Sequence, residues 1–185
     1  MTDRVDLLLE QYQKQLSLPW RRDLSGAERV WIAVYPPELE RRLGHRIDEF
    51  KLATIEADKA WRHKDLTSAF ATWMAGQEHR EAYFEEPELI APALNSFAET
   101  LKADIGALLD ADDVDDRTIV ALSGVGSLFP MVRVSTLIQG LASDIRGRLL
   151  LFFPGAYEHG NYRLLEARDG WNYLAIPITI PEGAR

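Results

Sequence analysis

The sequence predicts an α/β fold, a three-layer α/β/α sandwich with a mostly parallel sheet, and two observations carry that prediction. Continuous apolar runs, which are typical of strands buried on both faces, occur at residues 29–35, 117–122 and 148–153. Segments with the apolar spacing of amphipathic helices lie between these runs. Because parallel strands need helical crossovers that cover the sheet, the alternation favours a Rossmann-like or degenerate P-loop-like arrangement.

The chain begins with a predicted helix over residues 4–16, whose apolar residues recur at helical spacing and form one stripe. Either Thr2 or Asp3 can cap its first turn. The apolar, β-branched run 29–35 is the first buried strand, and the two prolines that follow it end it.

The middle of the chain is predicted to be mainly helical. Residues 38–58 form a helix that Gly44 weakens locally. Residues 59–65 are a weaker strand candidate that mixes aromatic with basic side chains, so the segment either grips nucleic acid or is an ordinary, partly exposed strand. A further helix opens at Asp65 or Thr67, and another spans residues 87–109.

An acidic segment at residues 110–116 cannot pack, and we expect it to be an exposed loop. The second buried strand follows at 117–122, and a glycine turn at 123–130 leads into a helix at 133–142. The glycine turn therefore directly follows the carboxyl end of a buried strand, and α/β proteins place their functional loops at this end of the strands.

The third buried strand, at residues 148–153, is predicted to end at Pro154 and Gly155, with a polar loop running to about residue 161. The last strand is expected at 173–178, where Pro177 places it at an edge of the sheet or at the strand's own end.

Composition predicts one α/β domain over residues 1–185, with the helical segment 1–18 packing on it. The 185 residues, 46% of them hydrophobic, are enough for a core that needs no disulfide or metal. The sequence contains no cysteine, which excludes disulfides, thiolate metal sites and a cysteine nucleophile. It has neither a signal-peptide pattern at its start nor a run of about 18 apolar residues, so we expect a cytoplasmic protein without a membrane span.

Charge argues against broad contact with nucleic acid, because the formal net charge is −8. Residues 78–116 hold twelve acidic residues against only Arg80 and Lys102. This concentration has two interpretations. It is either a solvated helix face with an acidic loop or a docking surface for a basic partner.

The glycine turn supplies the candidate phosphate-binding residues, Gly124, Gly126 and Ser127, because backbone N–H groups after a strand can converge on an anion. The spacing fits neither a Walker A loop nor a dinucleotide fingerprint. A tight strand-to-helix turn is the alternative. The four histidines lie in different elements without ligand partners at metal-site spacing, so no metal site is predicted.

Polar and aromatic residues are densest near the C-terminus, and a second aromatic pair precedes Pro87. These stretches are a polar network internal to the fold, a protein interface or a small-molecule site. The interface candidates that they supply are Tyr83, Phe84, Tyr157, Tyr162, Arg163, Arg168, Asp169 and Trp171.

Four segments together resemble the BrxB family of BREX phage-defence systems. They are residues 29–37, 61–74, 121–129 and 146–174, with the sequence RGRLLLFFPG at 146–155 and RDGWNYL at 168–174 among them. The resemblance covers nearly the whole chain. It implies a bacterial or archaeal protein that acts beside a DNA methyltransferase (PglX), an alkaline-phosphatase-like protein (PglZ) and a large ATPase (BrxC), and it supplies no catalytic residues.

The resemblance and the lack of a complete motif together predict a non-catalytic adaptor that binds PglZ, or else PglX or BrxC, and touches DNA only through the complex. We expect no cofactor and no metal. One alternative is a degenerate nucleotide-binding regulatory module that uses the glycine turn. The other is a DNA-contacting subunit, whose basic residues would be Arg21, Arg22, Arg41, Arg42 and Arg46.

Overall fold

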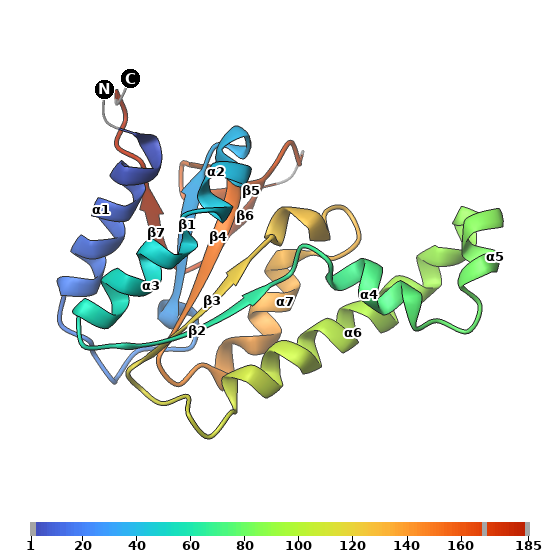
Figure 1. Cartoon of the computed structure of the whole chain (residues 1–185), viewed down its shortest axis with the longest axis horizontal. Helices are drawn as coiled ribbons and strands as arrows, with labels where there is room; N and C mark the ends of the chain where they lie inside the picture. The colour runs from blue at the N-terminus through green and yellow to red at the C-terminus, as the bar shows by residue number, and fades with distance from the viewer. Residues whose placement is uncertain (1–2, 168–169, 184–185) are drawn as a thin grey trace.

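The computed structural model describes residues 3–167 and 170–183, and it shows a mixed α/β fold (Figure 1). Within those residues, seven strands form one sheet whose main path runs β2-β3-β4-β1-β7. The strands are β1 (Val30–Tyr35), β2 (Ala60–Asp65), β3 (Thr118–Ser123), β4 (Arg148–Glu158), β5 (Asn161–Leu164), β6 (Trp171–Asn172) and β7 (Ile176–Thr179). The prediction of an α/β fold is confirmed in this general form.

The sheet has a parallel section with an antiparallel extension. All four strand pairs along the main path are parallel. In the pair of β1 with β4, Val30 lies opposite Leu149. Beyond that section β4 pairs antiparallel with β5, and β5 pairs antiparallel with β6. The sheet is therefore mixed, and Pro177 lies in the edge strand β7, as its missing N–H requires.

Helices α1 (Arg4–Ser17), α2 (Glu40–Gly44) and α3 (Ile47–Glu56) cover one face of the sheet (Figure 1). Trp31, Phe50 and Phe152 are buried between them and the strands, and the rings of Phe50 and Phe152 lie 5.0 Å apart edge to face. The Asp3 carboxylate accepts a hydrogen bond from the Val5 N–H at 3.1 Å. The first predicted helix and its Asp3 cap are therefore confirmed.

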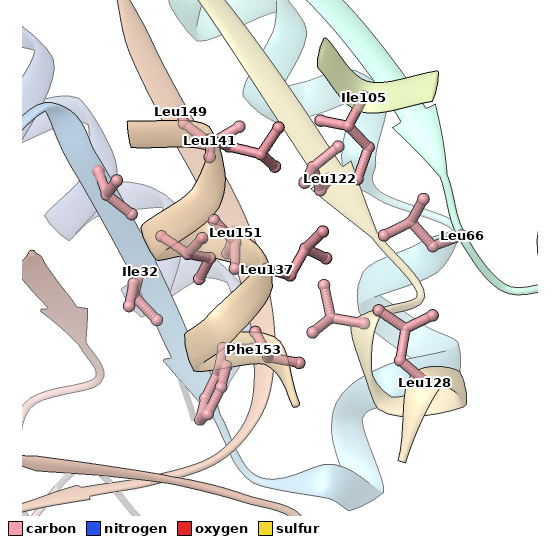
Figure 2. Close-up of a cluster of buried hydrophobic side chains, with 14 of the residues drawn as sticks. Ile32, Leu66, Ile105, Leu122, Leu128, Leu137, Leu141, Leu149, Leu151 and Phe153 are labelled. Carbon is pink, nitrogen blue, oxygen red and sulfur yellow. The ribbon is translucent and has the colours of Figure 1, made fainter. Parts of the chain in front are cut away.

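Helices α6 (Ile90–Leu109) and α7 (Val134–Leu141) cover the opposite face. Figure 2 shows Leu137 and Leu141 of α7 over Leu149 and Leu151 of β4, with Ile105 of α6 nearby. These side chains are almost fully buried. Burial on both faces explains why β1, β3 and β4 are continuously apolar and could be found from sequence.

The predicted helix 38–58 is wrong as one element. A 3₁₀ helix, η2 (Pro37–Leu39), leads into α2, which ends at Gly44, and α3 begins only at Ile47. The helix is interrupted after Gly44, which has a low helix propensity, and at Arg46, whose φ of −117° is not helical.

The third strand does not end at Pro154 and Gly155 as predicted. β4 continues to Glu158 and turns into β5, because Gly155 allows the two strands to approach closely: a Cβ there would lie 2.0 Å from the Arg163 carbonyl oxygen. The proline and glycine therefore continue the strand, and the expected polar loop is a β-hairpin.

Short helices lie between β2 and α6. They are α4 (Ala69–Ala75), α5 (Arg80–Glu85) and the 3₁₀ helix η3 (Pro87–Leu89). Further 3₁₀ turns are η1 (Ala27–Arg29), η4 (Val125–Leu128) and η5 (Ala142–Asp144). No helix within the two described ranges combines the length and the apolar character that a membrane span requires.

Candidate functional site

Close packing shapes the glycine turn that follows β3. Gly124 has φ of +69°, and a Cβ there would lie 2.4 Å from Thr67 Oγ1. A Cβ at Gly126 would lie 3.0 Å from Pro154 Cγ. Ser127 Oγ lies 2.6 Å from the Gly124 carbonyl oxygen and 3.0 Å from that of Leu66, so its one proton is used by the backbone. These contacts make the three residues parts of a tight turn, which is the alternative to phosphate binding.

Beside this turn, the structure brings together a histidine and a serine that the sequence places 60 residues apart. His63 Nε2 lies 2.8 Å from Ser123 Oγ. Partial burial lowers the pKa of His63, while Asp65 and Asp48 oppose that shift. Oδ1 of Asp65 accepts hydrogen bonds from the N–H and the hydroxyl of Thr67, at 2.9 Å and 2.6 Å. Ser123 is only 7% exposed, which leaves its hydroxyl little access to a substrate, so the pair is better suited to joining two strands than to nucleophilic catalysis.

The aromatic residues of the C-terminal hairpin form a cluster inside the fold. The Tyr162 ring lies 4.6 Å from that of Tyr157 and 5.3 Å from that of Trp171, measured between centroids. Tyr162 is fully buried, and its hydroxyl donates to the Ala175 carbonyl at 3.0 Å. Burial raises the pKa of Tyr162, which keeps the hydroxyl protonated. Tyr162 is therefore a core residue and not an interface residue, whereas Tyr157 and Trp171 are half-buried.

Charged candidates in the same region are only partly placed. Arg163 is exposed and lies 3.8 Å from a Glu158 carboxylate oxygen across the hairpin. Arg168 and Asp169 lie outside the described residues. The hairpin thus combines one exposed ion pair, of a kind that adds little stability, with an aromatic cluster whose central ring is buried.

Three of the acidic residues near position 110 belong to intramolecular ion pairs. Asp110, Asp113 and Asp116 pair with arginines from distant segments, namely Arg146, Arg62 and Arg22. Val114, in the middle of this loop, is 2% exposed. The expectation of an exposed loop is therefore confirmed for its five aspartates, whereas the expectation that the loop cannot pack is wrong, because Val114 is buried in the core.

The acidic residues near position 85 are different. Glu78, Glu81, Glu85, Glu86 and Glu88 are exposed, and none of them forms an ion pair within the part of the chain that the structure describes. They lie on a projection that we call the helical arm, residues 76–95, which comprises α5, η3 and the start of α6. Figure 1 shows α5 at the far end of this projection, away from the sheet. The docking interpretation of the acidic segment therefore fits the arm and not the loop.

Apolar side chains accompany these acids. Phe84 is 71% exposed and Leu89 is 45% exposed, while Tyr83 beside them is half-buried. Large apolar side chains this exposed, within a rim of charge, are typical of protein interfaces.

An aromatic cluster joins α4 and α6, the two helices that flank the arm, at the point where the arm leaves the body. The rings of Phe70 and Trp73 on α4 lie 5.3 Å and 5.4 Å from that of Phe97 on α6, and Phe97 is 1% exposed. Gln77 donates from its side-chain amide to the Trp73 carbonyl at 3.1 Å. The arm is therefore a rooted projection and not a loose loop.

A groove of about 720 Å³ runs along the base of the arm between α6 on one side and α7 with the segment leading into it on the other. Leu94 and Ala98 of α6 face Met131 and Leu137 across it, with Lys102 at one side. The groove extends the exposed apolar surface of the arm toward the body of the protein.

The five arginines of the DNA-binding alternative do not form one patch. Arg21 and Arg22 precede η1, whereas Arg41 and Arg42 lie on α2 and Arg46 follows it. Carboxylates pair with four of the five: Arg21 with Asp23, Arg22 with Asp116, Arg42 with Asp3, and Arg46 with Asp3, Asp6 and Glu49. This division removes the continuous basic surface that phosphate backbones require.

The sequence points to Tyr83 and Phe84 and to the acidic segment around them, but it does not distinguish the acids of the arm from Asp110, Asp113 and Asp116, which pair with arginines. It also missed α5, since six residues without an apolar stripe give no helical signal. Within the described residues, no group of three or more histidine or acidic side chains is placed to hold a metal ion.

Comparison with known proteins gives one match. The family model described as "BrxB: BREX protein BrxB" matches residues 52–178, which contain the arm, the groove and the C-terminal hairpin. No curated protein and no solved structure matches the chain.

Proposed function

The chain belongs to the BrxB family of BREX proteins, and we propose that it is a non-catalytic adaptor that docks on a larger BREX protein through its helical arm. The family makes the chain a component of a BREX system. The single observation that supports the docking role is the arm itself, which projects Phe84 and Leu89 among unpaired carboxylates.

The chemistry of the arm specifies its partner surface. Phe84 and Leu89 require apolar recesses, and the five surrounding glutamates require lysine or arginine at the rim. Because the arm is anchored by Phe97 before any partner binds, little ordering is needed on docking, which favours affinity. The groove beside α6 offers room for a segment of the same partner.

The partner that we propose is PglZ, with PglX and BrxC as the other candidates within a BREX system. Among residues 3–167 and 170–183, we find no cluster at the carboxyl edge of the strands that supports a reaction, since Ser123 is almost buried and Ser127 is bonded to backbone. A binding role is therefore better supported than an enzymatic one, and the chain would contribute to methylation and phage restriction only through the assembled complex.

The test is co-purification of the tagged chain with PglZ of the same system, followed by affinity measurement with variants of the arm. Phe84→Ala is expected to weaken binding by about tenfold or more, as loss of a central aromatic anchor does. Leu174→Ala is the matched control, because Leu174 is 72% exposed, almost the same as Phe84, but lies far from the arm in sequence. Neither variant should lose stability, because neither side chain is buried.

Charge reversal tests the rim. Glu85→Lys combined with Glu86→Lys should slow association and reduce its dependence on salt. If PglZ, PglX and BrxC all fail to bind the chain, or if Phe84→Ala and Leu174→Ala bind equally, the proposed docking through the arm is wrong.

A further inference from the structure

A charged cavity of about 770 Å³ opens at the edge of the sheet where the parallel strands begin, opposite the edge that the sequence pointed to. Seven of the residues that line it are basic and three are acidic, in a chain whose net charge is −8. The cavity therefore concentrates positive charge that the rest of the molecule lacks.

Four of these cations are neutralised by carboxylates of the chain. The pairs are Arg21 with Asp23, Arg22 with Asp116, Arg117 with Asp58, and Arg146 with Asp110. The other three, Arg29, Lys59 and Arg148, form no ion pair with any carboxylate of residues 3–167 and 170–183.

The three unpaired cations are held in place by neutral groups. Arg148 is 5% exposed and donates to the carbonyls of Gly147 and Arg21, at 2.9 Å and 3.2 Å. Arg29 donates to the carbonyls of Ile145, Arg146 and Arg22, between 2.7 Å and 3.2 Å. Carbonyl groups fix a guanidinium without cancelling its charge, so these contacts orient the cations and leave them positive.

Trp20 holds two of these cations over its ring. Arg148 Cζ lies 4.6 Å and Lys59 Nζ 4.8 Å from a ring centroid of Trp20. The ring attracts both cations and so keeps like charges close together beside the cavity. The Nε1 of Trp20 and the Nε of Arg29 are buried and have no hydrogen-bond partner in the described part of the chain.

Holding these three cations close together destabilises the fold when no anion is bound. Burial, and after it repulsion from Arg29, lowers the pKa of Arg148, which shows that the charged form is disfavoured where it lies. The carbonyl groups at the carboxyl-terminal ends of helices attract cations, but they account for only some of the basic residues that line the cavity. Arg146 donates to the carbonyls of Ala111 and Val114 just after α6, and Arg29 donates to that of Ile145 at the end of η5, whereas Lys59 and Arg148 contact no helix-terminal carbonyl among the hydrogen bonds of the described residues.

We propose that this cavity binds the phosphate groups of a small phosphorylated molecule, with Arg29 and Lys59 contacting the anion and Arg148 supplying charge from the wall beneath. Three unpaired cations fit a group with more than one negative charge, which favours phosphate over a single carboxylate. The volume is in the range of small-molecule sites. Asp112, Asp115 and Asp116 on the lining disfavour an extended polyanion such as duplex DNA.

Isothermal titration calorimetry of the full chain with pyrophosphate and with ATP, at constant ionic strength, tests the site. We expect saturable binding that Lys59→Met weakens by about tenfold or more, since a charge-assisted contact is lost. Methionine keeps the aliphatic contact with Trp20, and the Lys59 side chain makes no hydrogen bond to any residue that the structure describes, so the variant should fold. Lys59→Arg should restore binding. Lys51→Met is the matched control, because Lys51 is exposed on α3 and does not line the cavity.

A short DNA duplex forms the second arm of the titration. The proposal is overturned if neither small anion binds, if Lys59→Met and Lys51→Met bind like the unmodified chain, or if the duplex binds through Lys59 while the small anions do not. Loss of small-anion binding in Lys59→Met alone, with recovery in Lys59→Arg, supports it.

Discussion

His63 Nε2 lies 2.8 Å from Ser123 Oγ and so links the edge strand β2 to β3 through their side chains. The two residues lie at the carboxyl end of both strands, two positions apart in the parallel register. Because β2 is the most exposed strand of the parallel section, this bond helps to hold the edge of the sheet.

The first prediction concerns pH. Partial burial lowers the pKa of His63 below its ordinary value of 6.5, so the unfolded chain binds a proton there more readily than the folded chain does. The free energy of unfolding should therefore rise with pH through the window below 6.5 and reach its full value above it. Urea unfolding of the unmodified chain and of His63→Gln between about pH 5 and 7.5 measures this, since glutamine keeps a hydrogen bond to Ser123 but does not titrate.

His79→Gln, at an exposed position on the arm side, is the control for this experiment. It should leave the pH dependence in place. An equal slope in His63→Gln and the unmodified chain would show that His63 does not cause it.

A second prediction uses the buried contact between α1 and α3. The Thr54 hydroxyl donates its only proton to the Phe50 carbonyl at 2.7 Å, so the Tyr12 hydroxyl, 2.6 Å away, must donate to Thr54 Oγ1. Tyr12→Phe should cost about 1 kcal/mol, because it removes the donor. Thr54→Val should cost about 2 kcal/mol, because it leaves a fully buried donor unpaired.

The double variant should cost less than the sum of the two single variants, because both ends of the hydrogen bond are then apolar. Chemical denaturation of the four chains gives the coupling energy. Additive effects would indicate that the two hydroxyls do not act as a pair.

A third prediction separates two glycines that both have positive φ. Gly124→Ala should destabilise the fold by about 3 kcal/mol or more, because the φ of +69° is strained for alanine and the Cβ would also overlap Thr67 and Asp65. Gly160→Ala has the same kind of strain, at +81°, but no atom within 4 Å of the new Cβ, and should cost only about 1 kcal/mol. Thermal unfolding of both variants would reject this account if the two costs were equal.

The strands differ in how much of them the sequence could predict. The buried strands were predictable because burial on both faces makes β1, β3 and β4 continuously apolar. The extension of β4 was not, since Pro154 and Gly155 suggest a stop while Gly155 in fact permits the close approach of β5. A proline and a glycine after an apolar run look the same in the sequence whether the strand ends or continues. Only the pairing with β5 decides that β4 continues.

The candidate sites follow the same division. Tyr83, Phe84 and their acidic neighbours are contiguous, so the sequence could point to the arm. The cavity is assembled from Trp20, Arg29, Lys59 and Arg148, which come from four separate segments, and no spacing rule connects them. The ion pairs of Asp110, Asp113 and Asp116 could not be predicted for the same reason, because their arginine partners lie far away in the chain.

The last prediction compares two phenylalanines, one at the base of the arm and one at its tip. Phe97 is 1% exposed and packs against Phe70 and Trp73, so Phe97→Ala should lower the free energy of unfolding by about 3 to 5 kcal/mol. Phe84 is 71% exposed, so Phe84→Ala should change it by no more than about 0.5 kcal/mol. Urea unfolding of both variants measures the contrast. A large loss of stability in Phe84→Ala would mean that the tip of the arm packs on the protein itself, and the side chain would then be unavailable to a partner.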